Sequence, residues 1–189
     1  NKFGNKVAYK NMDVELTFNG IDCHVNSLIW YLQNKTNLKK GDKVALQMPN
    51  LLQYPIAIFA CLKAGFVIVN TNPLYTSDEM LHQYKDSDAK AIIIVENFAY
   101  NLEKILSETS IETVITTTIG DMLGTLKGSI VNFVIRKIKK MVPSYSISGS
   151  VSLKNILKSN KGKKGDTVKV NKDAEIIFQP YLDSGITNE

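Results

Sequence analysis

Short runs of β-branched residues alternate with helical patterns through the first 120 residues, and this alternation restricts the fold more than any other feature of the sequence. Continuous apolar runs predict strands that are covered on both faces, at residues 44–48, 66–69, 91–95 and 113–117. Helical patterns lie between and around them, at residues 21–34, 51–64, 78–87 and 98–108. Because such alternation builds βαβ units, the sequence predicts an α/β fold with a mainly parallel sheet and helices on both faces.

Several residues mark where these helices should begin and end. Asn50 is expected to cap the second helix, and Pro55 is expected just after its first turn, where a lost hydrogen bond would kink it. Gly65 stands just past the last turn of the same helix. Thr76 and Glu79 have the spacing of a capping box and predict the start of the next helix.

The pattern changes after residue 120, and the sequence divides into an α/β layer (1–128), a basic amphipathic helix (129–143) and a final part (144–189). Within the final part, residues 158–165 are rich in Lys and Gly and predict a mobile surface loop. Residues 168–170 and 175–179 predict two last strands.

The amphipathic helix is expected to end before Pro143 and to carry one apolar and one polar face. Its apolar face would hold Val131, Val134, Ile135, Ile138, Met141 and Val142, and its polar face Asn132, Arg136, Lys139 and Lys140. Residues 126–189 hold 12 basic and five acidic side chains, which suggests an anionic partner. We expect an anionic membrane surface, bound through Arg136, Lys137, Lys139 and Lys140. An apolar face that packs on the domain instead is an equally open alternative. Nucleic acid is not expected, because no aromatic platform interleaves these bases.

No catalytic residue and no metal site can be assigned from the sequence. His24 and His82 are the only histidines, and neither has a catalytic or zinc-binding spacing. Cys23 and Cys61 are too few for a disulfide framework, and no signal peptide opens the chain. We therefore expect a cytoplasmic protein, with peripheral contact to the inner membrane face as a further possibility.

Several strings together resemble the start of an acyl-adenylate-forming enzyme of the AMP-binding superfamily. They are GDKVALQMPNLLQYP at residues 41–55, CLKAG at 61–65 and VNTNPLYT at 69–76. Residues 16–18 and 62–65 are similar to the first two core motifs of the family. The bacterial long-chain fatty-acid–CoA ligases also have stretches similar to Gly120-Asp121 and to residues 127–143. The resemblance covers nearly all of residues 1–180.

The resemblance implies an enzyme that joins a fatty acid to ATP as an acyl-adenylate and then transfers the acyl group to coenzyme A. ATP, Mg²⁺ and coenzyme A are the cofactors it implies. The phosphate loop of the family, T-[SG]-G-[ST]-T-G-x-P-K-G, should follow the strand at 175–179. Ser184, Gly185 and Thr187 match this loop and are the residues expected to bind ATP.

The loop also departs from the family pattern. Asp183, Ile186 and Asn188 replace a threonine, a hydroxyl residue and a glycine, and the loop lysine does not appear. Asp183 would place a negative charge beside the phosphates. One hypothesis is therefore the N-terminal fragment of a long-chain fatty-acid–CoA ligase, inactive alone, with no cofactor bound by this chain by itself. Loss of pattern after Gln179 favours a disrupted reading frame or a partial sequence. The alternative is a non-catalytic remnant that binds a membrane surface or a partner protein.

Overall fold

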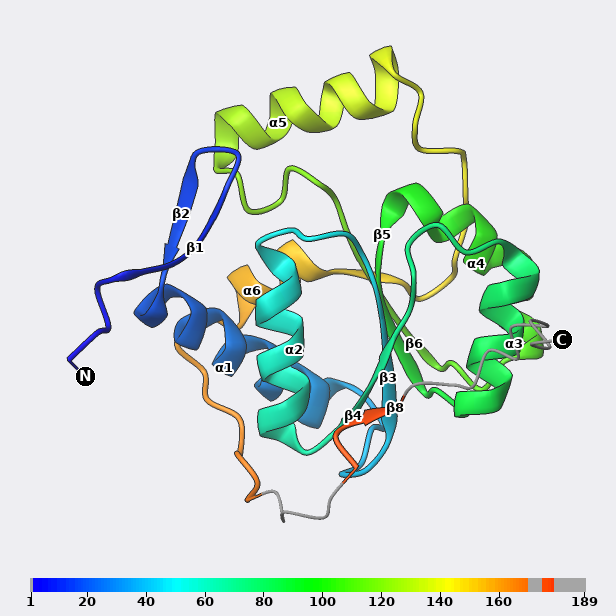
Figure 1. The fold of residues 1–189 in the computed structure, drawn as a ribbon, viewed down its shortest axis with the longest axis horizontal. Helices are drawn as coiled ribbons and strands as arrows, with labels where there is room; N and C mark the ends of the chain where they lie inside the picture. Colours follow the sequence, from blue (N-terminus) through cyan, green and yellow to red (C-terminus); the bar gives the residue numbers. More distant parts are fainter. Residues whose placement is uncertain (1, 170–174, 179–189) are drawn as a thin grey trace, which may run out of the picture.

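A six-stranded sheet forms the centre of the protein, as a computed structural model that describes residues 2–169 and 175–178 shows (Figure 1). Its order is β7-β6-β5-β3-β4-β8, and every pair of neighbours is parallel. The strands are β3 (Lys43–Gln47), β4 (Val67–Asn70), β5 (Ala91–Val95), β6 (Thr113–Thr117), β7 (Val151–Ser152) and β8 (Ile177–Phe178). The predicted mainly parallel sheet is confirmed.

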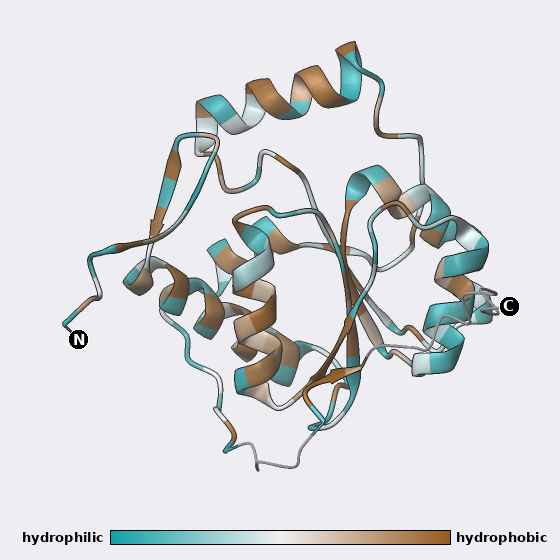
Figure 2. Cartoon of the chain, viewed as in Figure 1, coloured by the Kyte–Doolittle hydropathy of each residue, from teal (hydrophilic) through white to brown (hydrophobic). Residues whose placement is uncertain are grey.

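Helices cover both faces of this sheet, as the sequence predicts (Figure 1). On one face lie α1 (Phe18–Lys35), α2 (Gln53–Ala64) and α6 (Leu153–Ser159). On the other lie α3 (Ser77–Ser87) and α4 (Ala99–Ile105), with the 3₁₀ turns Glu96–Phe98 and Leu106–Glu108 before and after α4. The central strands are the most apolar part of the fold (Figure 2), because burial on both faces leaves no side for polar residues.

Two of the predicted helix boundaries are confirmed. The Thr76 hydroxyl accepts a hydrogen bond from the Glu79 N–H, and the Glu79 carboxylate accepts one from the Thr76 N–H, which completes the capping box. These bonds favour the ionised carboxylate and lower the pKa of Glu79. Gly65 ends α2 in a left-handed conformation, at φ +82°.

The predicted start of α2 is wrong. The helix begins at Gln53, and Leu52 precedes it without a side-chain cap, so Asn50 lies outside it. Pro55 is therefore the third residue of the helix. The first N–H groups of a helix have no partner within it, so proline costs no intrahelical bond here, and the expected kink has no cause.

An antiparallel hairpin, which the sequence did not predict, precedes α1. Its strands β1 (Val7–Asn11) and β2 (Val14–Thr17) form a sheet of their own. Met12 and Asp13 form the two-residue loop, and both have positive φ. A type I′ turn requires this conformation at both central residues.

The helix α5 (Thr125–Phe133) continues as a π-helical turn over Val134–Ile138 and lies apart from the other helices (Figure 1). It begins four residues before the predicted start at Ser129. It also ends before Pro143 is reached, because Lys140 adopts a left-handed conformation at φ 50°. Among the described residues, no helix combines the length and the apolar character that crossing a membrane requires.

The predicted surface loop at 158–165 is divided between the end of α6 and a segment held against α1. We call residues 160–168 the strap. The Gln33 amide of α1 donates to the Asp166 carbonyl and accepts from the Asp166 N–H, both at 2.8 Å. Val168 lies in the strap and is not in a strand; its N–H donates to the Lys63 carbonyl. Lys169 is not in a strand either, and Val170, the last residue of that predicted strand, lies outside the described residues.

Candidate functional site at the carboxyl edge of the sheet

The strand order places the candidate site at the carboxyl edge of the sheet. From β3 the chain passes to β4 on one side and then returns across β3 to β5 on the other. In open α/β sheets, ligands bind beyond the carboxyl ends of the strands at such a change of direction. The residues that follow β3, β4, β5 and β6 are therefore the first candidates.

A groove of about 580 Å³ lies beyond the ends of β3 and β4. Its polar groups include Tyr54 and Asn70, whose side chains form a hydrogen bond of 2.7 Å from the phenol to the amide oxygen. Leu74 and Phe98 supply apolar surface. The remaining lining residues are Met48, Pro49, Asn50, Thr71, Asn72 and Pro73.

Buried amides and a phenol hold the two strand ends in place. The Tyr84 hydroxyl donates to Gln47 Oε1 at 2.9 Å, and both side chains are fully buried. Burial raises the pKa of Tyr84, so the phenol stays a neutral donor. Gln83 donates to the Asn70 carbonyl at 2.9 Å, while its Oε1 has no partner among the described residues. The end of β4 is thus tied to α3 by side-chain bonds as well as by packing.

A second polar cluster follows β6 and joins the sheet to α5. The Asp121 carboxylate accepts hydrogen bonds from the Thr117 hydroxyl and from both the N–H and the hydroxyl of Thr118. Asn132 of α5 donates to the Thr118 hydroxyl and accepts from the Gly120 N–H, each at 2.8 Å. These bonds satisfy the loop after β6 and fix the position of α5.

An ion pair joins α5 to the end of β5. Glu96 directly follows β5 and is only 3% exposed. Arg136 donates to both of its carboxylate oxygens, with Nε at 2.8 Å from Oε1 and 3.0 Å from Oε2. These hydrogen bonds raise the pKa of Arg136. Arg136, which was expected to face lipid, is therefore bound to the residue that follows β5.

The described residues at this edge hold polar groups but no arrangement of nucleophile and base. His82 is exposed, and His24 lies in α1, away from this edge. Burial lowers the pKa of His24, and the positive charge of Lys161 lowers it further. Burial raises the pKa of Cys61 to about 12, so its thiol is not a nucleophile near neutral pH. No group of three His, Cys, Asp or Glu side chains is placed to hold a metal ion within residues 2–169 and 175–178.

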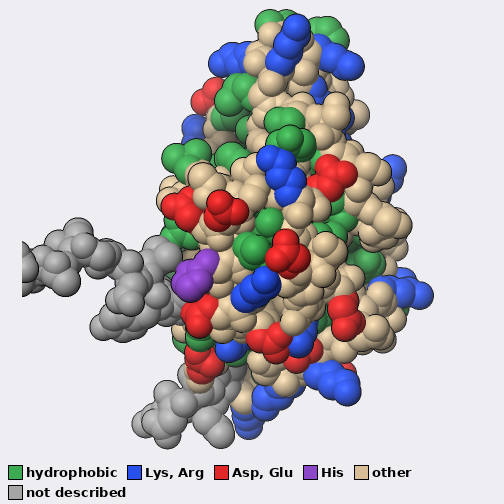
Figure 3. Space-filling view, turned by 90° about the vertical axis from the view of Figure 1, so that its right-hand side faces the viewer, with side chains coloured by type: hydrophobic (Ala, Val, Ile, Leu, Met, Phe, Trp, Pro, Cys, Tyr) green, Lys and Arg blue, Asp and Glu red, His purple; other side chains and the backbone are tan. Residues whose placement is uncertain are grey.

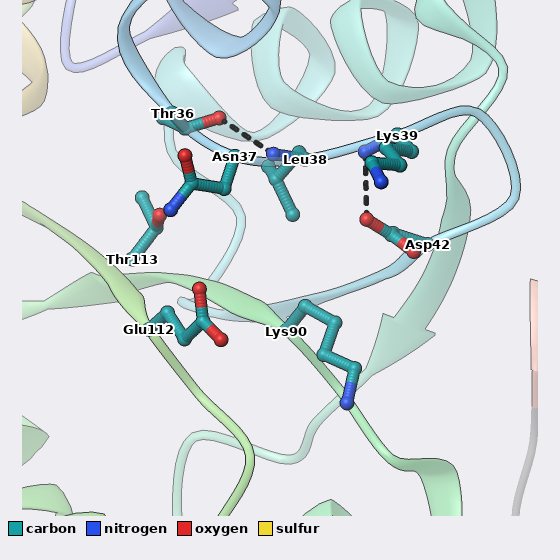
Figure 4. A pocket seen from close by; sticks show the side chains of 8 residues that line it. All are labelled: Thr36, Asn37, Leu38, Lys39, Asp42, Lys90, Glu112 and Thr113. Carbon is teal, nitrogen blue, oxygen red and sulfur yellow. Dashed lines mark hydrogen bonds between the residues drawn. The ribbon is translucent and has the colours of Figure 1, made fainter.

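A larger pocket, of about 670 Å³, lies at the opposite edge, where β3, β5 and β6 begin. Figure 4 shows Lys39, Asp42, Lys90 and Glu112 around it. Asp42 accepts a hydrogen bond from the Lys39 N–H at 2.7 Å, which closes the loop before β3. This pocket lies at the edge opposite the one where open α/β sheets bind their ligands, and the bond between Lys39 and Asp42 stabilises the turn that leads into β3.

The residues expected to bind ATP, Ser184, Gly185 and Thr187, lie outside the described residues. The strand that leads to them is described. It pairs in parallel with β4, with Phe178 opposite Val69, so β8 ends at the same edge as the groove. Sequence reasoning missed Glu96, and it missed the structural roles of Asp121 and Asn132. The first two follow a strand or its turn, and this position is the signal that could have identified them.

These features define a doubly wound α/β unit whose polar groups gather at the carboxyl edge, the class of fold that binds nucleotides at this edge. Residues 1–173 match the family model described as AMP-binding enzyme. The chain therefore belongs to the AMP-binding enzyme family.

Curated relatives are long-chain-fatty-acid–CoA ligases. That of Salmonella typhimurium is 48% identical over 156 residues, which cover 82% of this chain and 28% of the relative. That of Yersinia pestis is 44% identical over 168 residues, which cover 89% and 30%. The similarity to bacterial long-chain fatty-acid–CoA ligases is confirmed, and the chain spans less than a third of the length of these relatives.

Solved structures share the fold. A benzoate CoA ligase from Burkholderia xenovorans LB400 superposes with a TM-score of 0.70 at 15% identity, over 93% of this chain and 29% of that one. A long-chain-fatty-acid-CoA ligase from Archaeoglobus fulgidus gives a TM-score of 0.67 at 21% identity, over 93% and 31%. Conservation of the fold at such low identity indicates that the sheet and its helices are the common scaffold of these ligases.

Proposed function

We propose that this chain forms the N-terminal part of a long-chain fatty-acid–CoA ligase and supplies the scaffold from which the ATP phosphate loop extends. The observation that carries this proposal is the parallel placement of β8 beside β4 in a chain of the AMP-binding family. A loop that follows β8 starts at the carboxyl edge, next to the groove lined by Tyr54 and Asn70. Fatty acid, ATP and coenzyme A are the substrates of the complete ligase.

The role of this chain in that reaction is to position groups. Adenylation needs hydrogen-bond donors that stabilise charge on the phosphates of ATP, and a metal ion that helps to neutralise it. Ser184, Gly185 and Thr187 are the donors we assign to the phosphates, and Asp183 opposes them. We assign no ligand for Mg²⁺ and no contact with coenzyme A to the described residues.

The isolated chain is expected to have no ligase activity. Loss of one preorganised donor commonly lowers a rate by about 10²–10³, and Asp183, Ile186 and Asn188 depart from the loop pattern of the family. ATP–pyrophosphate exchange with a long-chain fatty acid measures adenylation directly. We expect no exchange above background from the 189-residue chain. Exchange that is abolished by Ser184→Ala and Thr187→Ala would contradict this expectation.

A second candidate function, binding to an anionic membrane surface, is favoured by α5. This helix carries exposed apolar side chains, and Lys137, Lys139 and Lys140 are exposed near its end. Together these features suit a helix that lies in the interface rather than across the bilayer. We propose that α5 holds the protein at the membrane, which would bring the site close to fatty acids in the lipid phase.

A further inference from the structure

The apolar residues exposed on α5 and its π-helical turn differ in part from those that the sequence placed on its apolar face. Leu126, Ile130 and Phe133 are 77%, 55% and 59% exposed, and spacings of four and three place them on one side of the helix. We call these three residues the outer ridge. Of the residues expected on the apolar face, Val131, Val134, Ile135 and Val142 are half-buried, whereas Ile138 and Met141 are 65% and 53% exposed. The outer ridge is therefore an apolar surface on α5 that a partner can reach, in addition to Ile138 and Met141 beyond it.

Contacts on the opposite side of the helix fix its rotation. Gly128 is buried against Gly120, where a Cβ on Gly128 would meet the Gly120 carbonyl oxygen at 2.3 Å. Asn132 and Arg136 follow at spacings of four and bind Thr118, Gly120 and Glu96. Arg136, which the sequence assigned to lipid, and Asn132 of the predicted polar face thus point at the sheet. Both side chains have hydrogen-bond partners there. Rotating the helix about its axis would therefore leave the Glu96 carboxylate buried without a partner.

Positive charge surrounds the outer ridge. Lys137 lies four residues beyond Phe133 on the same side, and Lys139 and Lys140 follow at the end of the helix. No acidic residue occurs between Asp121 and Asp166. Lysine and arginine side chains accompany hydrophobic ones around α5 at the top of Figure 3. An apolar ridge beside lysines, without acids, is complementary to anionic lipid headgroups above acyl chains.

We infer that the outer ridge is the surface that enters the membrane interface, with Lys137, Lys139 and Lys140 at the lipid phosphates and with Arg136 still bound to Glu96. This inference rests on the proposed membrane function and assigns its contact residues. Since Asn132 and Arg136 bind residues that follow β6 and β5, α5 lies beyond the carboxyl edge of the sheet. Docking by the outer ridge therefore turns the candidate site toward the bilayer.

Vesicle co-sedimentation of the 189-residue chain tests this inference. The probes are vesicles of phosphatidylcholine alone and of phosphatidylcholine mixed with phosphatidylglycerol. Leu126→Ser should weaken binding to the anionic vesicles about tenfold. Replacement of Leu126, Ile130 and Phe133 together by Ser should abolish this binding. Ile176→Ser is the matched control, because Ile176 is 42% exposed and precedes β8, at the opposite edge of the sheet, so this variant should bind as the unchanged chain does.

A second pair of variants tests the charges. Lys137→Gln, Lys139→Gln and Lys140→Gln together should weaken binding by about fivefold for each lysine. The same number of changes at exposed Lys154, Lys158 and Lys164 should have less effect. Circular dichroism and the fluorescence of Trp30, the single tryptophan, show whether each variant is folded.

The outcomes separate the two proposals. If the unchanged chain ignores anionic vesicles, the membrane function fails and the inference fails with it. If binding persists in a folded triple outer-ridge variant, the membrane function stands but the assigned surface is wrong. If sedimentation velocity shows that the outer ridge joins two copies of the chain and vesicles do not compete, the occupant is a second copy and the inference is overturned.

Discussion

Arg136 satisfies a carboxylate that the fold buries. Glu96 follows β5 at the sheet edge, and nothing else among the described residues supplies a positive charge to it. Isolated buried charges are costly, and a paired one that loses its partner destabilises a protein strongly. The sequence pattern read Arg136 as one of a row of surface bases, because spacing alone does not show which neighbour lies across a loop. Its measured role should therefore be in stability, unlike that of the lysines that follow it.

Replacing Arg136 by Met tests this role at the residue scale. The change leaves the buried Glu96 carboxylate without its partner. Since Arg136 is about half exposed, we expect a loss of about 1–3 kcal/mol in the free energy of unfolding. Lys137→Met removes the same charge from an exposed position and should change it by less than about 0.5 kcal/mol. Urea denaturation followed by circular dichroism measures both. Equal effects of the two changes would show that Glu96 does not depend on Arg136.

At the scale of elements, the strap shows how a loop-like sequence becomes a fixed connection. Lys163 lies over the ring of Trp30, with Nζ at 3.5 Å from the ring centre. The Gln33 side chain donates to the Asp166 carbonyl and accepts from the Asp166 N–H. Gly165 passes so close to α1 that a Cβ there would meet Ile29 Cγ2 at 2.3 Å. Lys and Gly composition predicts mobility, and it misses these contacts because they join residues far apart in the sequence.

Gly165→Ala should detach the strap from α1. We expect a loss of about 1–3 kcal/mol from the forced displacement, together with a change in the fluorescence of Trp30 as Lys163 moves away. Lys164→Ala alters the neighbouring exposed residue and serves as the control. If the alanine variant at 165 keeps both the unfolding free energy and the Trp30 emission of the unchanged chain, the close packing of the strap is not required.

How far the sequence predicts the fold depends on the element. The strands β3, β4, β5 and β6 could be predicted because burial on both faces leaves continuous apolar runs. The β1–β2 hairpin could not, because only Leu16 of its strands is buried and no regular alternation results. The helix α6 has seven residues, too few for a clear period. At the site, the sequence predicted the strand that the structure shows as β8, whereas Glu96, Asp121 and Asn132 gain their roles only from tertiary contacts.

At the scale of the whole molecule, the sheet carries the central claim. Two hydrophobic clusters, one on each face of the sheet, give it a core of its own. The groove, the buried polar networks and the end of β8 all lie at its carboxyl edge. The chain belongs to the AMP-binding family and shares its fold with a ligase that is only 15% identical, so the same sheet forms from very different sequences. The chain should thus be able to replace the matching part of a related ligase.

The most direct measurement is long-chain acyl-CoA formation by two chimeras with the Salmonella typhimurium relative. In the first, residues 1–178 of this chain replace the matching segment and the relative supplies everything after β8. In the second, residues 1–189 do so, which brings in Asp183, Ile186 and Asn188. We predict that the first chimera forms acyl-CoA and that the second forms at least about 100-fold less, since it loses phosphate donors. A first chimera that folds, binds ATP and forms no acyl-CoA would contradict the account, as would a second chimera as active as the first.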